Sequence, residues 1–173
     1  AIILPASNNL SKSSTVFTVL FAGRGGIEKR IHLITAMAEN LKHTDTSIQF
    51  EILGDVSGSV DIAKYPYVKF YGNQSDNERI SKIYQNAHLL LLTSSTEGFP
   101  MVVIEAMAHG CAVAATPVGD IPLHIKNNEN GFLFSNVNDE KAIVTEGIKF
   151  ILQLKNNGAK FEEISLNNSK YAK

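Results

Sequence analysis

Two glutamates, Glu97 and Glu105, are the residues of this chain whose type and spacing best suit chemistry on a ligand. Glu97 lies in a polar Gly-Pro loop after an apolar run, and Glu105 lies about a turn and a half into the helix predicted near Pro100. Proline suits the first turn of a helix, where the N–H that it lacks has no partner. The free N–H groups and partial positive charge of such a helix start attract anions. Two carboxylates beside an anion site suit a ligand with hydroxyls and phosphate, such as a nucleotide sugar.

Two basic residues lie near the start of the chain, after another apolar segment. Arg24 is part of the glycine-rich turn 23–26, and Lys29 lies near the start of the next predicted helix. The glycines let a backbone approach a ligand closely. They do not form the G-x-G-x-x-G dinucleotide fingerprint, because Glu28 stands where the third glycine would be. On the residues alone, a solvated arginine and lysine on a surface turn is the better interpretation.

Alternating strands and helices are predicted to position these residues. Apolar segments predict strands at 16–22, 47–53, 68–71, 88–93, 112–115 and 131–134. Helices are predicted at 28–42, 77–87, 100–109 and 139–154, with a short one starting near residue 120. We expect Asp139 and Asp120 to cap the helices that follow them. This alternation predicts an α/β fold with a doubly wound parallel sheet, in which ligands bind beyond the carboxyl ends of the strands.

Composition narrows the classes of function. The chain has 173 residues, which suits one domain, and a net charge of −1, which gives no general attraction to nucleic acid. The single Cys111 excludes an internal disulfide and is expected to be a buried apolar residue. The histidines have no metal-ligand spacing, so no metal is expected. No apolar run reaches membrane-spanning length and the first residues lack a signal-peptide pattern, so we expect a cytoplasmic protein.

The motifs around these residues resemble a known family. Residues 94–110 match S-x-x-E-G-F-P-x-x-x-x-E-A-M-A-x-G, which contains the E-x7-E pair of the "group 1" glycosyltransferases. Residues 23–29 resemble the G-R-x-x-x-x-K segment of that family, and 111–120 and 130–134 resemble its downstream segments. The matches follow the family's order over about residues 16–135. The chain thus resembles the C-terminal half of retaining enzymes with the GT-B fold, which is Rossmann-like.

The resemblance implies a role for each site residue. Arg24 and Lys29 would bind the diphosphate of the donor and neutralise the leaving group, Glu105 would bind the ribose hydroxyls, and Glu97 would contact the donor sugar. Six further residues would border the donor: Gly23, Gly98, Phe99, Pro100, Met101 and Gly119. The donor would be a UDP- or GDP-sugar, and no cofactor or metal would be needed.

The resemblance also implies the larger enzyme. Residues 1–14 would be a linker or N-terminal loop, 15–156 the nucleotide-sugar binding domain, and 157–173 a polar, partly helical tail. The missing N-terminal domain would bind the acceptor, so the isolated chain is expected to be inactive. The complete hexosyltransferase would transfer sugar with retention of configuration, in cell-surface polysaccharide or glycolipid synthesis. Its full-length form could associate peripherally with the cytoplasmic face of the membrane.

Several positions depart from the family pattern. Arg30 replaces a common glycine, and His88 and Thr93 replace a usual aspartate and proline. Asp120 replaces the second glycine of a Gly-Gly pair, and Leu123 stands where glutamate is frequent. These changes affect the surroundings of the expected donor site, whereas the pair of glutamates is intact.

Three rival functions remain open on the sequence. A non-catalytic nucleotide-sugar binding module and a GT-B epimerase acting on a nucleotide sugar would share much of this site. A dinucleotide-dependent oxidoreductase is disfavoured by the broken glycine fingerprint and by the lack of a ribose-binding acid after the second strand.

Overall fold

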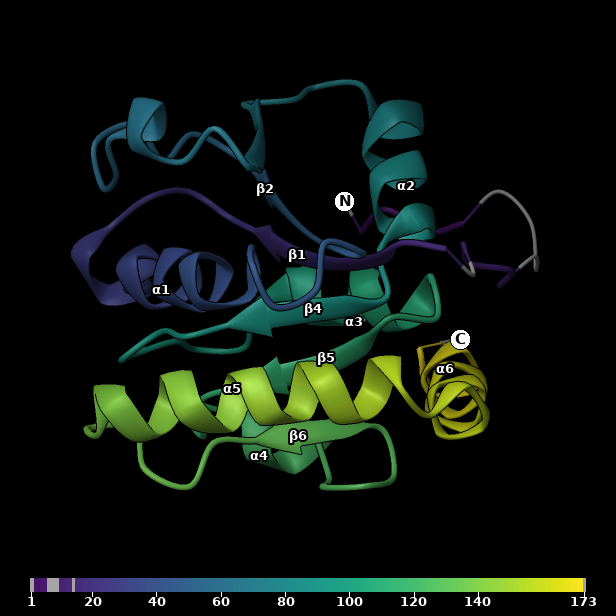
Figure 1. The fold of residues 1–173 in the computed structure, drawn as a ribbon. Helices are drawn as coiled ribbons and strands as arrows, with labels where there is room; N and C mark the ends of the chain where they lie inside the picture. The colour runs from purple at the N-terminus through teal and green to yellow at the C-terminus, as the bar shows by residue number, and fades with distance from the viewer. Residues whose placement is uncertain (1, 6–9, 14, 173) are drawn as a thin grey trace.

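A computed structural model describes residues 2–5, 10–13 and 15–172 of the chain. They form a sheet of six parallel strands in the order β3-β2-β1-β4-β5-β6 (Figure 1). The strands are β1 Phe17–Ala22, β2 Ile48–Leu53, β3 Val68–Gly72, β4 Leu89–Leu92, β5 Ala112–Ala115 and β6 Gly131–Leu133. The order reverses between β1 and β4, as in doubly wound nucleotide-binding sheets. The predicted doubly wound parallel sheet is confirmed.

Helices cover both faces of the sheet. They are α1 Ile31–Leu41, α2 Asn77–Asn86, α3 Met101–Ala108, α4 Ile121–His124, α5 Glu140–Lys155 and α6 Gly158–Tyr171, with short 3-10 turns at Ile27–Lys29 and Ile62–Lys64. In Figure 1, α5 lies in front of the sheet and α3 behind it. Helix α1 packs against α5, and α3 packs against α6. A Cβ atom on Gly147 of α5 would lie 2.6 Å from the Met37 sulfur of α1, so glycine permits this close approach.

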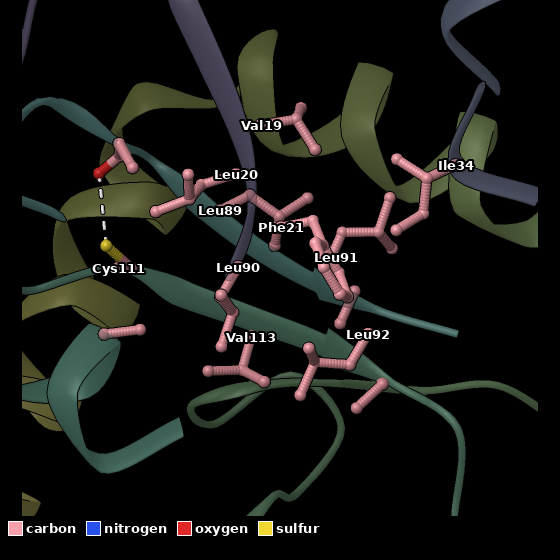
Figure 2. Close-up of a cluster of buried hydrophobic side chains, with 14 of the residues drawn as sticks. Val19, Leu20, Phe21, Ile34, Leu89, Leu90, Leu91, Leu92, Cys111 and Val113 are labelled. Atoms are coloured by element: carbon pink, nitrogen blue, oxygen red, sulfur yellow. Dashed lines mark hydrogen bonds between the residues drawn. The ribbon is translucent and has the colours of Figure 1, made fainter. Parts of the chain in front are cut away.

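The centre of the sheet is the core of the protein. All residues of β1 and β4 are buried, and Figure 2 shows their side chains packed together with Ile34 and Val113. Strands buried on both faces read as continuous apolar runs, which explains the four consecutive leucines at 89–92. Cys111 is a buried free cysteine, as predicted.

The helix predicted over 28–42 is wrong at its start. Residues Ile27–Lys29 form a 3-10 turn, and Arg30 has the left-handed backbone conformation, with φ of 49°. An α-helix cannot pass through such a residue, so α1 begins only at Ile31. The apolar residues at helical spacing begin at Ile31, so the pattern contained no signal that excluded residues 28–30 from the helix.

The two predicted aspartate caps have different outcomes. The Asp139 side chain accepts a hydrogen bond from the Ala142 N–H, so the cap of α5 is confirmed. The prediction for Asp120 is wrong, because its side chain makes no capping bond to α4. Its backbone N–H instead donates to the Gly98 carbonyl at 3.1 Å, which ties this turn to the loop after β4.

The C-terminal segment forms α6 and packs on the body of the protein. Its buried residues are Ile164 and three polar residues, Ser165, Asn168 and Ser169, and the helix packs against α3 and β5. The Asn168 amide donates to the Cys111 and Asn130 carbonyls at 2.7 and 2.8 Å. The division of the chain at residue 156 stays a prediction. None of the helices in the described part of the chain is long and apolar enough to span a bilayer.

A half-buried lysine holds the N-terminal segment. The Lys12 ammonium donates to the Tyr84 and Gln85 carbonyls at the end of α2 and to the His109 carbonyl after α3. Burial lowers the pKa of Lys12, and nearby Cys111 opposes that shift. This lysine adds a donor to carbonyls at helix ends, where few partners come from the helix itself.

Candidate functional site

Glu97 lies in the loop after β4 and forms an ion pair that the sequence did not predict. The Lys29 ammonium is 2.6 Å from Glu97 Oε1, and the side chains of the two residues are 22% and 11% exposed. The Ser94 hydroxyl donates to the same oxygen at 2.7 Å. The structure therefore brings together one predicted cation and one predicted carboxylate, at the carboxyl edge of the sheet.

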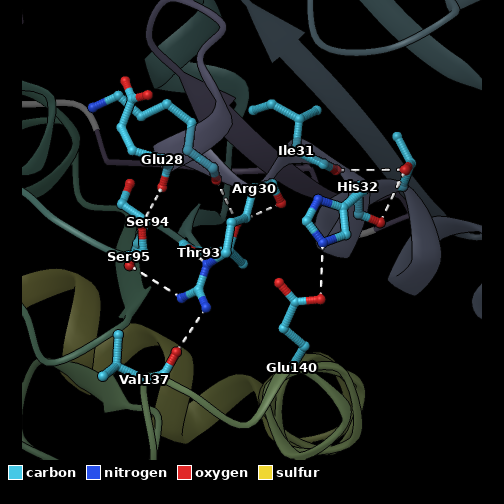
Figure 3. Close-up of polar contacts among 11 residues, drawn as sticks. Glu28, Arg30, Ile31, His32, Thr93, Ser94, Ser95, Val137 and Glu140 are labelled. Atoms are coloured by element: carbon cyan, nitrogen blue, oxygen red, sulfur yellow. Dashed lines mark hydrogen bonds and ion pairs between the residues drawn. The ribbon is translucent and has the colours of Figure 1, made fainter.

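Backbone contacts fix the two segments that carry this pair. The Ser95 N–H donates to the Glu28 carbonyl at 2.8 Å, and the Thr93 hydroxyl donates to the Lys29 carbonyl at 2.9 Å and to the Arg30 carbonyl at 3.1 Å (Figure 3). The turn before α1 and the loop after β4 thus form one frame. Thr93 replaces a usual proline, which has no hydroxyl with which to make these bonds.

Arg30 joins a third segment to this frame. Its guanidinium donates to the Thr93 carbonyl at 2.6 Å, to the Ser94 carbonyl at 3.2 Å and to the Val137 carbonyl, before α5, at 2.6 Å (Figure 3). The left-handed backbone of Arg30 explains why glycine is common here in the resembled family. The sequence showed that Arg30 stands in place of a common glycine. It did not show the hydrogen bonds that stabilise Arg30 there, because the accepting carbonyls come from loops distant in sequence.

Arg24 lies on the exposed turn after β1, and no described residue pairs with its guanidinium. The turn is held by the Gly23 N–H, which donates to the Leu53 carbonyl at 2.9 Å. A Cβ atom on Gly54 would lie 2.0 Å from the Gly23 carbonyl oxygen, so the two turns are in close backbone contact. Arg24 and Lys29 therefore flank the same turn, one free among the described residues and one paired.

Gly119 packs against the loop that carries Glu97. It has φ of 55°, and a Cβ atom here would lie 2.1 Å from the Gly98 carbonyl oxygen and 2.3 Å from that of Glu97. Only glycine fits this contact without a shift of backbone. The packing of the loop therefore accounts for glycine at this position, whether or not it borders a ligand.

The rest of this loop contacts an aromatic pair. The Phe99 ring lies 4.2 Å from the His124 ring between centroids, and His124 Nδ1 is 2.6 Å from the Tyr171 hydroxyl at the end of α6. Pro100 precedes the first residue of α3, Met101, which is 49% exposed. No sequence pattern predicted the contact with Tyr171, which comes from the C-terminal helix α6.

Glu105 lies in a different environment from Glu97. It is buried on α3 and accepts hydrogen bonds from the Tyr84 hydroxyl of α2 at 2.9 Å and from the Ile3 N–H at 3.0 Å. Burial, followed by the nearby carboxylate of Glu105, raises the pKa of Tyr84. The two glutamates share no hydrogen-bond partner among the described residues. The structure supplies a donor, Tyr84, that the sequence analysis missed.

Two further features bear on the chemistry of the surface. The described residues include no group of three or more histidine, cysteine, aspartate or glutamate side chains that could hold a metal ion.

A cavity of about 670 Å³ lies at the opposite, amino edge of the sheet, where Phe17, His88 and Phe161 are among its lining residues. This cavity contains neither glutamate of the pair, so it is separate from the site described above.

The fold and the site define a class of protein, the doubly wound α/β domains whose ligands bind where the strand order reverses. The family model "Glycosyl transferases group 1" matches residues 6–167. The chain therefore belongs to this family, and the predicted resemblance to the Rossmann-like C-terminal half of GT-B glycosyltransferases is confirmed.

Curated relatives are longer than this chain. It is 31% identical over 127 residues to a D-inositol 3-phosphate glycosyltransferase of Mycobacteroides abscessus, over 66% of this chain and 28% of the relative. It is 30% identical over 135 residues to the sulfoquinovosyl transferase SQD2 of Arabidopsis thaliana, over 74% of this chain and 25% of the relative. The chain thus spans about a quarter of the length of these relatives.

Solved structures are similar over nearly the whole chain. TarM has a TM-score of 0.80 at 26% sequence identity, over 99% of this chain and 34% of TarM. Anabaena HepE in complex with UDP has a TM-score of 0.74 at 22% identity, over 91% of this chain and 44% of HepE. The second likeness is one of fold alone.

Proposed function

We propose that the carboxyl edge of this sheet binds the nucleotide-sugar donor of a retaining glycosyltransferase. The observation that carries the proposal is the position of the Lys29–Glu97 pair. It lies between the loops after β1 and β4, the two strands between which the strand order reverses. Ligands of doubly wound sheets bind at this crevice. Family membership and neighbours that carry UDP or UDP-glucose support the same ligand class.

The donor would contact residues of both loops. Arg24 and Lys29 are the cations for the diphosphate, and they would stabilise the charge that develops on the leaving group. The N–H groups of Gly98, Phe99 and Met101 lie at the start of α3, and Gly23 lies beside Arg24. Helix starts and exposed backbone N–H groups suit phosphate oxygens. Pro100 has no N–H, and Gly119 supports the loop by its packing.

The two carboxylates would bind different parts of the donor. Glu105 would accept the ribose hydroxyls, with Tyr84 orienting its carboxylate. In the structure the Ile3 N–H occupies one oxygen of Glu105, so the N-terminal segment would have to shift for ribose to bind there. Glu97 would accept hydroxyls of the donor sugar. The reaction would retain configuration, with the leaving phosphate assisting the incoming hydroxyl on the same face.

The finer assignment is a hexosyltransferase that uses a UDP- or GDP-sugar without a metal cofactor. The acceptor would bind a further domain, because the chain spans only about a quarter of its curated relatives. We place the complete enzyme in polysaccharide or glycolipid synthesis, in the cytoplasm or at the cytoplasmic face of the membrane. A non-catalytic binding module and a GT-B epimerase are the alternatives that the acceptor assay below distinguishes.

Calorimetric titration of the chain with UDP, GDP and ADP tests the donor site. We expect one nucleoside diphosphate to bind, with the same affinity in the presence and absence of EDTA. Lys29→Ala should weaken that binding, whereas Lys149→Ala on α5, outside the site, should not. If none of the three nucleotides binds, or if EDTA abolishes binding, the proposal is wrong.

A further inference from the structure

The Lys29–Glu97 pair neutralises the lysine before any ligand arrives. The ammonium and Glu97 Oε1 are 2.6 Å apart, and both side chains are largely shielded from water. Partly buried charges attract each other more strongly than exposed ones, because less solvent screens them. A phosphate that approaches Lys29 must therefore compete with a carboxylate that is already bound.

The pair is part of the built frame and is not a chance arrangement of two flexible side chains. Lys29 is anchored through its carbonyl by Thr93, and Glu97 is oriented by the Ser94 hydroxyl at Oε1. Arg30 and the Ser95–Glu28 backbone bond hold the two segments together. The loss of side-chain entropy that weakens most surface ion pairs is reduced where the backbone is fixed in this way.

We propose that Glu97 competes with phosphate for Lys29, so that the site selects the nucleotide sugar against the nucleoside diphosphate produced from it. This inference rests on the proposed function. When the phosphate of a nucleoside diphosphate binds the Lys29 ammonium, the Glu97 carboxylate lies beside that phosphate. Glu97 then shares the lysine with the phosphate or loses it as a counter-ion. Repulsion between these negative charges weakens binding. The released product is therefore disfavoured by the same carboxylate that the donor needs.

The sugar of the donor removes this penalty. No described residue hydrogen bonds to the second oxygen of Glu97, Oε2. Sugar hydroxyls are donors that can reach a carboxylate, and bonds to a charged acceptor are among the stronger hydrogen bonds in proteins. When Lys29 leaves Glu97 for the phosphate, the sugar hydroxyls of an intact donor thus supply Glu97 with new hydrogen bonds. A free nucleoside diphosphate has no sugar at this position and supplies none. Glu97 is in this way a specificity-determining residue as well as a sugar contact.

The test compares UDP with UDP-glucose on wild type and Glu97→Gln by calorimetry of the 173-residue chain. Glutamine keeps the size of the side chain and removes the charge. We expect Glu97→Gln to bind UDP about 3- to 10-fold more tightly, as for loss of a partly shielded charge pair. Its preference for UDP-glucose over UDP should fall. Glu28→Gln is the matched control, since it removes a carboxylate next to Lys29 that makes no ion pair with any described residue, and it should change UDP affinity less than twofold.

A second pair of variants isolates the competition. In the Lys29→Ala background, where no lysine is left to compete for, Glu97→Gln should strengthen UDP binding less than it does in wild type. Thermal melting checks that each variant folds, and Glu97→Ala replaces Glu97→Gln if that variant does not, with the same expected tightening. If wild type binds UDP but the Glu97 variant binds it no more tightly, the inference is overturned and the donor site stands. If UDP, GDP and ADP all fail to bind wild type, the proposed function fails, and the inference fails with it; if GDP or ADP binds instead of UDP, the same comparison is made with that nucleotide and its glucose conjugate.

Discussion

At the scale of single residues, Arg30 connects an unusual backbone conformation with the stability of the candidate site. A non-glycine residue at φ of 49° costs on the order of 1 kcal/mol. Its buried guanidinium offsets that cost by donating to three carbonyls from two loops. Glycine at this position would remove the backbone strain. It would also remove the side chain that connects the loop after β4 with the loop before α5.

Replacing Arg30 with lysine should lower the free energy of unfolding by about 2 kcal/mol, because one ammonium cannot reach all three carbonyls. Urea denaturation measures the change. Arg24→Lys is the matched control on an exposed turn and should alter stability by less than about 0.5 kcal/mol. Equal stability of the two variants would show that the carbonyl contacts contribute nothing net.

Arg24 and Lys29 give a prediction about charge. If both bind the diphosphate, wild-type affinity should rise from uridine to UMP to UDP, and the rise should shrink with added salt. Arg24→Ala should cost more than Arg24→Lys if the guanidinium makes a forked contact. Titrations of the three ligands at two salt concentrations measure this. An affinity that does not rise with phosphate number would contradict the assignment of both residues.

At the scale of elements, α2 and α3 meet at the Tyr84–Glu105 hydrogen bond, which no hydrophobic pattern encodes. Removing the tyrosine hydroxyl leaves a buried carboxylate with one donor fewer, so Tyr84→Phe should destabilise the fold by roughly 1–3 kcal/mol. Tyr71→Phe, which removes a half-buried hydroxyl bonded to Glu51, is the control for loss of a tyrosine–carboxylate bond elsewhere. Urea denaturation compares the two.

Glu105 gives a separate prediction for binding. Glu105→Ala should weaken UDP by roughly 1–3 kcal/mol, since it removes bonds between ribose hydroxyls and a charged acceptor. Glu97→Ala should not weaken UDP, since this glutamate would contact only the sugar of the donor. Calorimetry on both variants measures the difference. Equal losses of UDP affinity would mean that the two roles have been misassigned.

The start of β4 carries a buried histidine that predicts acid sensitivity. His88 Nδ1 accepts from the Thr18 N–H at 3.1 Å, which only the neutral ring can do. Burial lowers the pKa of His88, and the charge of Lys12 lowers it further, against the Ser13 carbonyl. The folded state thus binds a proton less readily than the unfolded chain. The contribution of neutral His88 to the free energy of unfolding is fully present above the histidine pKa of the unfolded chain, about 6.5. It is lost as the pH falls below that value, by at most about 1.4 kcal/mol per pH unit.

His88→Asn should therefore reduce the loss of stability between pH 7 and 5. Asparagine does not titrate but can still accept and donate. His43→Asn, at an exposed position, is the matched control for replacing a histidine with asparagine. Urea denaturation at several pH values gives the slopes. His109, whose pKa burial also lowers, should account for part of the slope that remains.

At the scale of the whole molecule, the chain matches about a quarter of the length of its curated relatives. A donor site at one edge of a sheet has no acceptor unless a second surface faces it. We therefore expect the chain alone to bind a nucleotide sugar but not to transfer sugar. Incubation with UDP-glucose and a mixture of candidate acceptors, followed by mass spectrometry, measures turnover. Transfer above a Glu97→Ala control would contradict the two-domain reading, and epimerised UDP-sugar would favour the epimerase.

The strands, the order of the motifs and the family could all be predicted from local sequence. Apolar runs and their boundaries are local properties, so the strand at 89–92 and the cap at Asp139 could be predicted from neighbouring residues. The position of Glu97 after a buried strand also followed, because parallel strands place such loops at one edge of the sheet.

Which of these residues contact one another depends on how the elements pack in three dimensions. Lys29 and Glu97 lie far apart along the chain, and their contact depends on β1 and β4 being neighbours. The left-handed Arg30 is stabilised by carbonyls from two distant loops, and Glu105 faces Tyr84 rather than Glu97. Periodicity reports which face of an element is buried, but the partner of a charged side chain depends on strand order and rotamer, which no local pattern contains.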